Sequence, residues 1–296
     1  MALLDDLKRK YSLASMSERL IAINLIIFVC YHLINTSLRL FQVKAFDLNT
    51  WLAFPQEVSE LLIKPWTLFS YAFFHEGLWH ILLNMIVFHF SARFFSTYFS
   101  GKRLLTVYLL GGVCGAVLFS LAYGVFPLFE SISANNLRGA SGAIMAVMFV
   151  VVGYAPHLKV RLFFLGEISF WWIALFFVMQ DIISIPTMEN SGGNFAHLGG
   201  ALFGYIYALQ LKKGNDIGAW FEKWMDSLVS FFKPKKKSPL KTVHKTHKTS
   251  KNTSRSSRAE RPNQKEIDAI LDKISKSGYE SLTKKEKDLL FKAGKE

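Results

Sequence analysis

The segment "LRGASGAIMAV", residues 137–147, places a serine among small residues at the start of an apolar run. Ser141 follows Gly139 and Ala140 and precedes Gly142. The segment carries no base, metal ligand or cofactor motif of its own. A lone serine in such a run is usually a packing residue that bonds a backbone carbonyl one turn back. A chemical role for Ser141 therefore depends on what the rest of the chain brings to it.

The surrounding chain is too apolar for an ordinary soluble domain. Its 296 residues are 51% hydrophobic and include 27 Phe and 7 Trp. Residues 1–211 hold 13 Lys and Arg against 11 Asp and Glu, whereas residues 212–296 hold 22 against 11. Cys30 and Cys114 both lie in apolar runs, so a structural disulfide is not expected and each is interpreted as a small hydrophobic residue. We expect a nearly neutral membrane body followed by a basic tail.

The apolar runs predict an all-α polytopic membrane protein. A helix needs about 20 apolar residues to cross a bilayer. Lys and Arg cluster before the first run and after the second, fourth and sixth, which predicts cytoplasmic N- and C-termini. No cleavable signal precedes the first run, so it is expected to be retained. The predicted spans of this six-helix bundle are residues 20–38, 78–98, 104–125, 139–156, 168–186 and 194–211.

The connection between the first two spans, about 39–77, is long and rich in aromatic residues. Such a segment is typical of a loop that lies in the outer membrane interface. A simple interfacial anchor and a substrate-handling element fit its composition equally well.

Polar side chains recur at membrane depth, where each one needs an explanation. The second span carries His80 and Asn84, the fourth carries Ser141, and the sixth carries Asn194 and His197. These three spans run in the same direction, and each polar group falls within about two turns of the helix start. The three helices are therefore expected to bring these groups to a similar depth.

The spacing of these residues suits acyl-transfer chemistry. His80 and Asn84 are spaced i, i+4 and share a helix face, where their donors could hold an oxyanion. The unpaired backbone N–H groups at a helix start near Ser141 suit the same charge. Small residues face each other in the fourth and sixth spans and allow close approach. These are Gly139, Gly142 and Ala146 in one span and Ala196, Gly200 and Gly204 in the other. That approach would pair Ser141 with His197 as nucleophile and base.

Other polar residues are expected to be structural. His75 and His89 are read as structural or interfacial, and Asp181 as a solvated helix end rather than a partner that orients His197. The HExxxH spacing of His75, Glu76 and His80 is one residue too long for a zinc-binding HExxH pair. No metal and no cofactor are expected.

Three segments resemble the signatures of the rhomboid intramembrane serine proteases. They are "HEGLWHILLNMIVF" with His80 and Asn84, "RGASGAI" with Ser141, and "GGNFAHLGGALFG" with His197. The resemblance implies a six-helix core over residues 20–211, with a Ser141–His197 dyad that has no acidic third member. His80, Asn84 and the Ser141 backbone N–H would form the oxyanion hole, and Gly142 is also assigned to this oxyanion and substrate site. Many relatives have an aromatic residue four positions after the serine, where this chain has Met145.

The resemblance also implies a function, an intramembrane serine endopeptidase that cleaves single-span membrane proteins near the outer end of their helix. It further implies a bacterial cytoplasmic membrane and a site open to the outer face. The alternatives from other classes are a catalytically silent rhomboid-fold binder or chaperone of membrane helices, and a small transporter. A transporter would more often carry intramembrane acidic residues and internal repeats.

Residues 1–19 are expected to form a cytoplasmic N-terminal segment before the membrane domain. The tail that follows the membrane domain is expected to have three parts. Residues 212–232 predict an amphipathic interfacial helix, which "KPKKK" would help to hold on anionic lipid head groups. Residues 233–262 are expected to be a disordered basic linker. Residues 263–296 predict a small helical hairpin with capping boxes at Asn263 and Thr283. Membrane attraction explains the positive charge without nucleic acid, so no nucleic-acid partner is expected.

Overall fold

The structure is a computed structural model that describes residues 2–43, 47–129, 136–162, 166–187, 190–232 and 264–293. The chain forms two compact units, Met1–Lys235 and Lys236–Glu296, and each is described by itself. The predicted linker 233–262, together with Asn263, lies outside the described residues.

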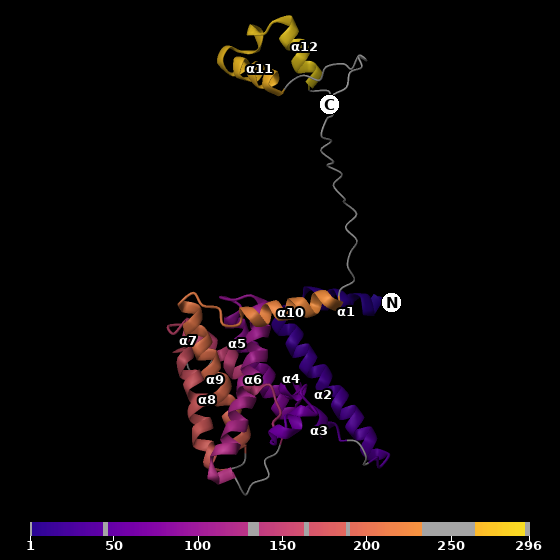
Figure 1. The fold of residues 1–296 in the computed structure, drawn as a ribbon, viewed down its shortest axis with the longest axis vertical. Helices are drawn as coiled ribbons and strands as arrows, with labels where there is room; N and C mark the ends of the chain where they lie inside the picture. The colour runs from indigo at the N-terminus through magenta and orange to yellow at the C-terminus, as the bar shows by residue number, and fades with distance from the viewer. Residues whose placement is uncertain are drawn as a thin grey trace, which may run out of the picture. The chain divides into compact units, whose positions relative to one another are not determined.

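Helices occupy all six predicted spans, and the all-α polytopic prediction is confirmed (Figure 1). They are α2 (Met16–Leu40), α5 (Leu78–Phe95), α6 (Gly101–Val125), α7 (Ser141–Tyr154), α8 (Phe170–Ser184) and α9 (Ser191–Lys212). By length and composition α2, α5, α6 and the stretch Phe170–Thr187 can cross a membrane. At 14 residues, α7 is shorter.

Short elements connect these helices. They are α1 (Ala2–Leu13), α3 (Leu48–Leu52), η1 (Val58–Leu62), α4 (Thr67–Ser70), η2 (Tyr71–Phe73), η3 (Pro127–Phe129), η4 (Ile185–Thr187), β1 (Lys159–Leu162) and β2 (Gly166–Ser169). The strands pair antiparallel, with Lys159 opposite Ser169 and Leu162 opposite Gly166. Strands of four residues are too short to show a clear alternating pattern, so the sequence did not predict this hairpin.

The centre of the first unit is α7, which packs against α5, α6, α8 and α9. Every residue from Gly142 to Gly153 is buried. A helix that is apolar on all sides must be covered on all sides. The neighbouring helices supply that cover. Ser141 is therefore the first residue of the central helix of the bundle.

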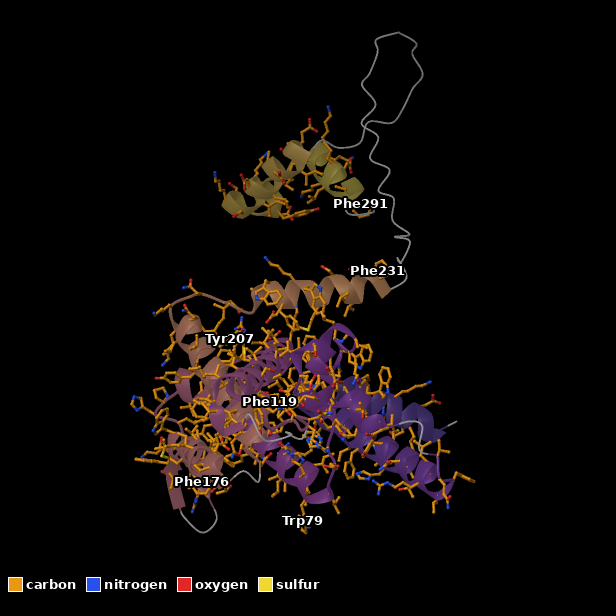
Figure 2. The ribbon with its side chains drawn as sticks, turned by 60° about the horizontal axis from the view of Figure 1, so that its bottom comes forward. Trp79, Phe119, Phe176, Tyr207, Phe231 and Phe291 are labelled. Carbon is orange, nitrogen blue, oxygen red and sulfur yellow. The ribbon has the colours of Figure 1, made fainter. Side chains whose placement is uncertain are left out.

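The outward faces of the bundle are apolar. Trp79 on α5 is 73% exposed and Phe176 on α8 is 65% exposed, whereas Phe119 on α6 is fully buried. Figure 2 labels the first two at the periphery and Phe119 inside. Large exposed side chains of this kind indicate a surface whose solvent is lipid.

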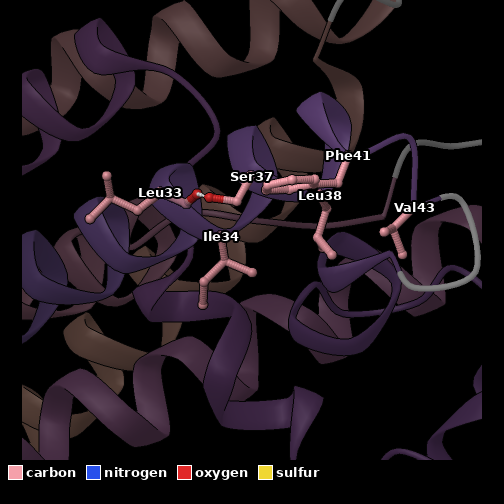
Figure 3. Close-up of a pocket in the computed structure, with 6 residues that line it drawn as sticks. All are labelled: Leu33, Ile34, Ser37, Leu38, Phe41 and Val43. Carbon is pink, nitrogen blue, oxygen red and sulfur yellow. Dashed lines mark hydrogen bonds between the residues drawn. The ribbon is translucent and has the colours of Figure 1, made fainter.

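An apolar cavity of about 390 Å³ lies at the end of α2 (Figure 3). Its lining residues are Leu33, Ile34, Ser37, Leu38, Phe41 and Val43. The polar group among them, the Ser37 hydroxyl, already donates to the Leu33 carbonyl at 2.8 Å. None of the predicted site residues lines this cavity.

Two helices lie across one end of the bundle, α1 and α10 (Ala219–Phe232) (Figure 1). The turn before α10 is fixed by Asp216, which accepts hydrogen bonds from Arg103, from the Tyr207 hydroxyl and from the Gly218 N–H. Lys102 pairs with Asp226 on α10. Phe221 is buried against the bundle at 3% exposure. These contacts attach α10 to the start of α6.

The second unit contains α11 (Gln264–Ser277), η5 (Tyr279–Ser281) and α12 (Lys284–Ala293). Ile270 and Leu282 are its buried apolar side chains among the described residues, at 5% and 6% exposure. Glu286 accepts from the Thr283 N–H at 2.7 Å and the Thr283 hydroxyl at 2.8 Å. Lys273 on α11 adds an ion pair to Glu286 at 2.9 Å, which ties the two helices together.

Candidate active site

Ser141 is the first residue of α7, where the backbone N–H groups of the first turn have no partner inside the helix. A helix of this length spans about 21 Å at 1.5 Å per residue. A bilayer's hydrocarbon core is about 30 Å thick. At least one end of α7 therefore lies inside the membrane. The connecting segment at that end must enter the membrane to reach it.

The backbone that leads into Ser141 is held by the segment between α2 and α5. Phe54 and Leu137 exchange two backbone hydrogen bonds, at 2.9 and 2.8 Å. The Gly139 N–H donates to the Tyr71 carbonyl at 3.0 Å. Phe54 and Tyr71 are each 1% exposed. The aromatic loop therefore does more than rest in the interface, because it fixes the approach to Ser141.

His75 also helps to hold this backbone, and we call Phe54, Tyr71 and His75 together the clamp. It is fully buried, and its Nε2 accepts the Ala140 N–H at 3.2 Å. Its ring also meets the His80 ring edge-on, with centroids 5.1 Å apart. The structural role expected for His75 thus falls directly beside the candidate site, one residue before Ser141.

His80 lies over the turn that precedes Ser141. Gly139 has a φ of +113°, and a Cβ built there would lie 2.7 Å from His80 Nε2. Both facts require glycine, since other residues rarely adopt this φ and any side chain would displace the imidazole. Asn84, 8% exposed, donates from Nδ2 to the His80 carbonyl at 2.8 Å. A second amide proton remains on Asn84 for another acceptor.

The backbones of α7 and α9 are almost in contact along their small residues. A Cβ at Gly200 would lie 1.9 Å from the Gly142 carbonyl oxygen, and one at Gly204 would lie 2.2 Å from that of Ala146. A Cβ at Gly142 would lie 3.0 Å from the Ala196 carbonyl oxygen. Each helix thus contacts the other through residues that the sequence analysis assigned to packing.

Ser141 and His197 each adjoin this contact. Ser141 directly precedes Gly142, and His197 directly follows Ala196. Among the described residues, the Ser141 hydroxyl makes no hydrogen bond, including to His197. Catalytic hydrogen bonds are often loose without substrate and tighten when it binds.

One polar contact of His197 differs from expectation. Its Nδ1 lies 2.7 Å from Oδ1 of Asp181, which is 4% exposed on α8. The interpretation of Asp181 as a solvated helix end is therefore wrong. Asp181 lies one turn before the end of α8, and α9 covers it. The resemblance implies a histidine without an acidic partner, and in this chain that partner is present.

The fold defines a polytopic helical membrane protein in which His75 and His80 lie beside the turn that precedes Ser141, and in which α9, the helix that carries His197, packs against α7. Residues 63–214 match the Rhomboid domain. Residues 255–293 match a second model, the Family of unknown function (DUF6576). The chain belongs to the rhomboid family, as its signature segments predict.

Curated relatives include proteins from bacteria, plants and animals. The rhomboid protease GlpG of Yersinia enterocolitica is 31% identical over 162 residues, which cover 54% of this chain and 52% of that protein. RHOMBOID-like protein 12, mitochondrial, of Arabidopsis thaliana is 29% identical over 158 residues (50% and 47%). Presenilin-associated rhomboid-like protein A, mitochondrial, of Danio rerio is 29% identical over 190 residues (64% and 45%). The chain thus spans about half the length of the curated relatives it matches.

Proposed function

We propose that this rhomboid-family protein is an intramembrane serine endopeptidase that cleaves single-span membrane proteins. The observation that carries the proposal is the contact between Gly142 and Gly200, since it brings the residues beside it, Ser141 and the α9 turn with His197, to the same level of the bundle. A silent binder of membrane helices would need none of these polar groups. GlpG, named as a protease, is one of the relatives.

In this mechanism Ser141 Oγ attacks the scissile carbonyl carbon, and its proton moves to His197 Nε2. The new oxyanion accepts hydrogen bonds from the Ser141 backbone N–H, His80 and the free Asn84 amide proton. His197 then gives the proton to the departing amine as the C–N bond breaks. Water attacks the acyl-serine, again with His197 as base, and restores the Ser141 hydroxyl.

Membrane placement is the second part of the proposal. On α10 the aromatic side chains of Trp220 and Trp224 are 63% and 48% exposed. Aromatic residues beside a lysine-rich sequence suit anionic lipid head groups. We place α1, α10 and both termini on the cytoplasmic side of a bacterial inner membrane, with the site open to the outer face. Brominated lipids should quench Trp220 and Trp224 fluorescence, and protection from quenching would contradict the lipid contact.

Cleavage in proteoliposomes tests the proposal. The full chain is reconstituted with a panel of single-span substrates, beside Ser141→Ala and His197→Ala. We expect the parent to cut within or near the substrate helix and both variants to be inactive. Cleavage that persists in both variants would exclude the dyad. A parent that binds substrates without cleaving any would support the binder alternative.

A further inference from the structure

A polar contact in the site that the proposed mechanism leaves unused joins α8 to α9. The distance from His197 Nδ1 to Asp181 Oδ1 is 2.7 Å. This falls in the range of charge-assisted N–H···O⁻ hydrogen bonds. The Asp181 side chain is 6% exposed and that of His197 is 21% exposed, so water screens the pair weakly.

A buried acid in a membrane helix is costly unless it has a partner. Among the described residues, His197 is the hydrogen-bond partner of Asp181, and Oδ2 of the same carboxyl group has none. A carboxylate can only accept, so Nδ1 of His197 must carry the proton of this bond. The other ring nitrogen, Nε2, is then left with its lone pair free.

We propose that Asp181 is a positioning residue that fixes His197 in the tautomer and orientation needed to take the Ser141 proton. Its negative charge also stabilises the imidazolium that forms when that proton arrives. Met145, four residues after Ser141, has no flat ring that could hold the imidazole by stacking. The carboxylate holds it instead. The inference rests on the proposed function, because a base is needed only if Ser141 reacts.

Asp181→Asn separates this role from a structural one. The amide oxygen can still accept the Nδ1 proton, so helix packing and substrate affinity should be retained. The substitution removes the negative charge. It also no longer fixes the His197 tautomer, since the amide can rotate and donate to Nδ1 instead of accepting from it. The corresponding change in a serine-protease triad costs about 10⁴-fold in kcat. We expect kcat here to fall by about 10²-fold or more with KM and thermal unfolding unchanged.

Gln180→Leu is the matched control. Gln180 is the adjacent polar residue on α8, and its amide bonds Ser184 at 2.7 Å on the exposed face. This variant should cleave like the parent. A kcat in Asp181→Asn within about twofold of the parent would overturn the positioning role. A loss of kcat that the loss of folded protein fully explains would also overturn it, because that outcome indicates a structural contact.

A spectroscopic measurement keeps the inference independent of activity. Nitrogen NMR on isotope-labelled histidine in the full chain, with the His197 signal assigned by its loss in His197→Gln, reports which ring nitrogen is protonated. We expect the proton on Nδ1 in both the parent and Ser141→Ala. A proton on Nε2 in the neutral ring would overturn the inference. Failure of the parent to cleave would reject the proposed function while leaving this result interpretable.

Discussion

Gly200 on α9 and Gly142 on α7 approach so closely that a Cβ on the first would lie 1.9 Å from the carbonyl oxygen of the second. No flexible side chain can move aside, because the obstacle is backbone. The distance between Ser141 and His197 thus depends on a contact that neither of them makes. The candidate site is as sensitive to helix spacing as to its own polar residues.

Gly200→Ala should therefore separate α7 from α9. We expect a destabilisation of about 1–3 kcal/mol from overpacking. We also expect a loss of cleavage that exceeds what the unfolded fraction explains, since a small misplacement of reacting groups can cost about 10²-fold. Thermal unfolding and cleavage rate are measured on the same sample.

Gly124→Ala is the control for that substitution, because Gly124 is also in a membrane helix and a Cβ there meets nothing within 4 Å. It should be neutral or slightly stabilising. Equal activities in the two alanine variants would contradict the role given to the α7–α9 contact.

Gly139→Ala should damage the oxyanion side of the site. The φ of +113° strains an alanine, and its methyl group would displace the His80 imidazole. We expect kcat to fall by about 10²-fold, the typical cost of one oxyanion donor. Steady-state cleavage kinetics measure this effect.

Gly166→Ala separates backbone strain from the clash with His80. Gly166 also has a positive φ, +71°, but a Cβ there meets nothing within 4 Å. It begins β2, away from Ser141. A similar loss of kcat in both variants would show that strain alone is responsible and would remove the argument for His80.

Much of this site follows from the sequence. Hydropathy places the spans, and polar residues in apolar helices attract notice because lipid penalises them. The burial of Asp181 was not predicted because the sequence does not locate the end of a span to within one helical turn. A shift of one turn decides whether an acid is solvated or covered by a neighbouring helix. The clamp formed by Phe54, Tyr71 and His75 was also missed. Its contacts join residues more than sixty positions apart, and no periodic pattern reports them.

Asp216→Asn should weaken the attachment of α10 to the bundle. Burial raises the pKa of Asp216, but hydrogen bonds from Tyr207 and the Gly218 N–H, together with the Arg103 guanidinium, outweigh it and lower the pKa overall. The carboxylate is therefore the form that holds the turn. We expect faster proteolysis between α9 and α10 in the variant.

Asp226→Asn is the matched control for that change. Asp226 also pairs with a basic residue of α6, Lys102, but its side chain is 67% exposed. Exposed pairs contribute little. Proteolysis as fast in Asp226→Asn as in Asp216→Asn would contradict the anchoring role of Asp216.

The C-terminal unit should lose stability in acid. Hydrogen bonds from Thr283 and the ion pair with Lys273 lower the pKa of Glu286 to about 2, well below the ordinary value of a glutamate. A depressed carboxyl pKa contributes stability that is complete above the unfolded value and disappears as pH falls toward the folded one. We expect the protection factors against hydrogen exchange in residues 264–293 of the full chain, corrected for the intrinsic rate at each pH, to fall between about pH 4.5 and pH 2.

Glu286→Gln should show weaker protection already at neutral pH and a flatter pH profile. Glu280→Gln is the control, because Glu280 also pairs with a lysine but is 92% exposed in its side chain. If Glu280→Gln lost as much protection, the Lys273–Glu286 ion pair would not be what joins α11 to α12.

The central claim is that Ser141 is a nucleophile activated by His197. Active-site labelling of the reconstituted full chain with a fluorophosphonate tests it most directly, because the reagent reacts with an activated serine whatever the substrate. We predict a single adduct, mapped by mass spectrometry to Ser141, whose rate of formation collapses in His197→Ala. Labelling at another serine, or labelling of Ser141 at an unchanged rate without His197, would contradict the account.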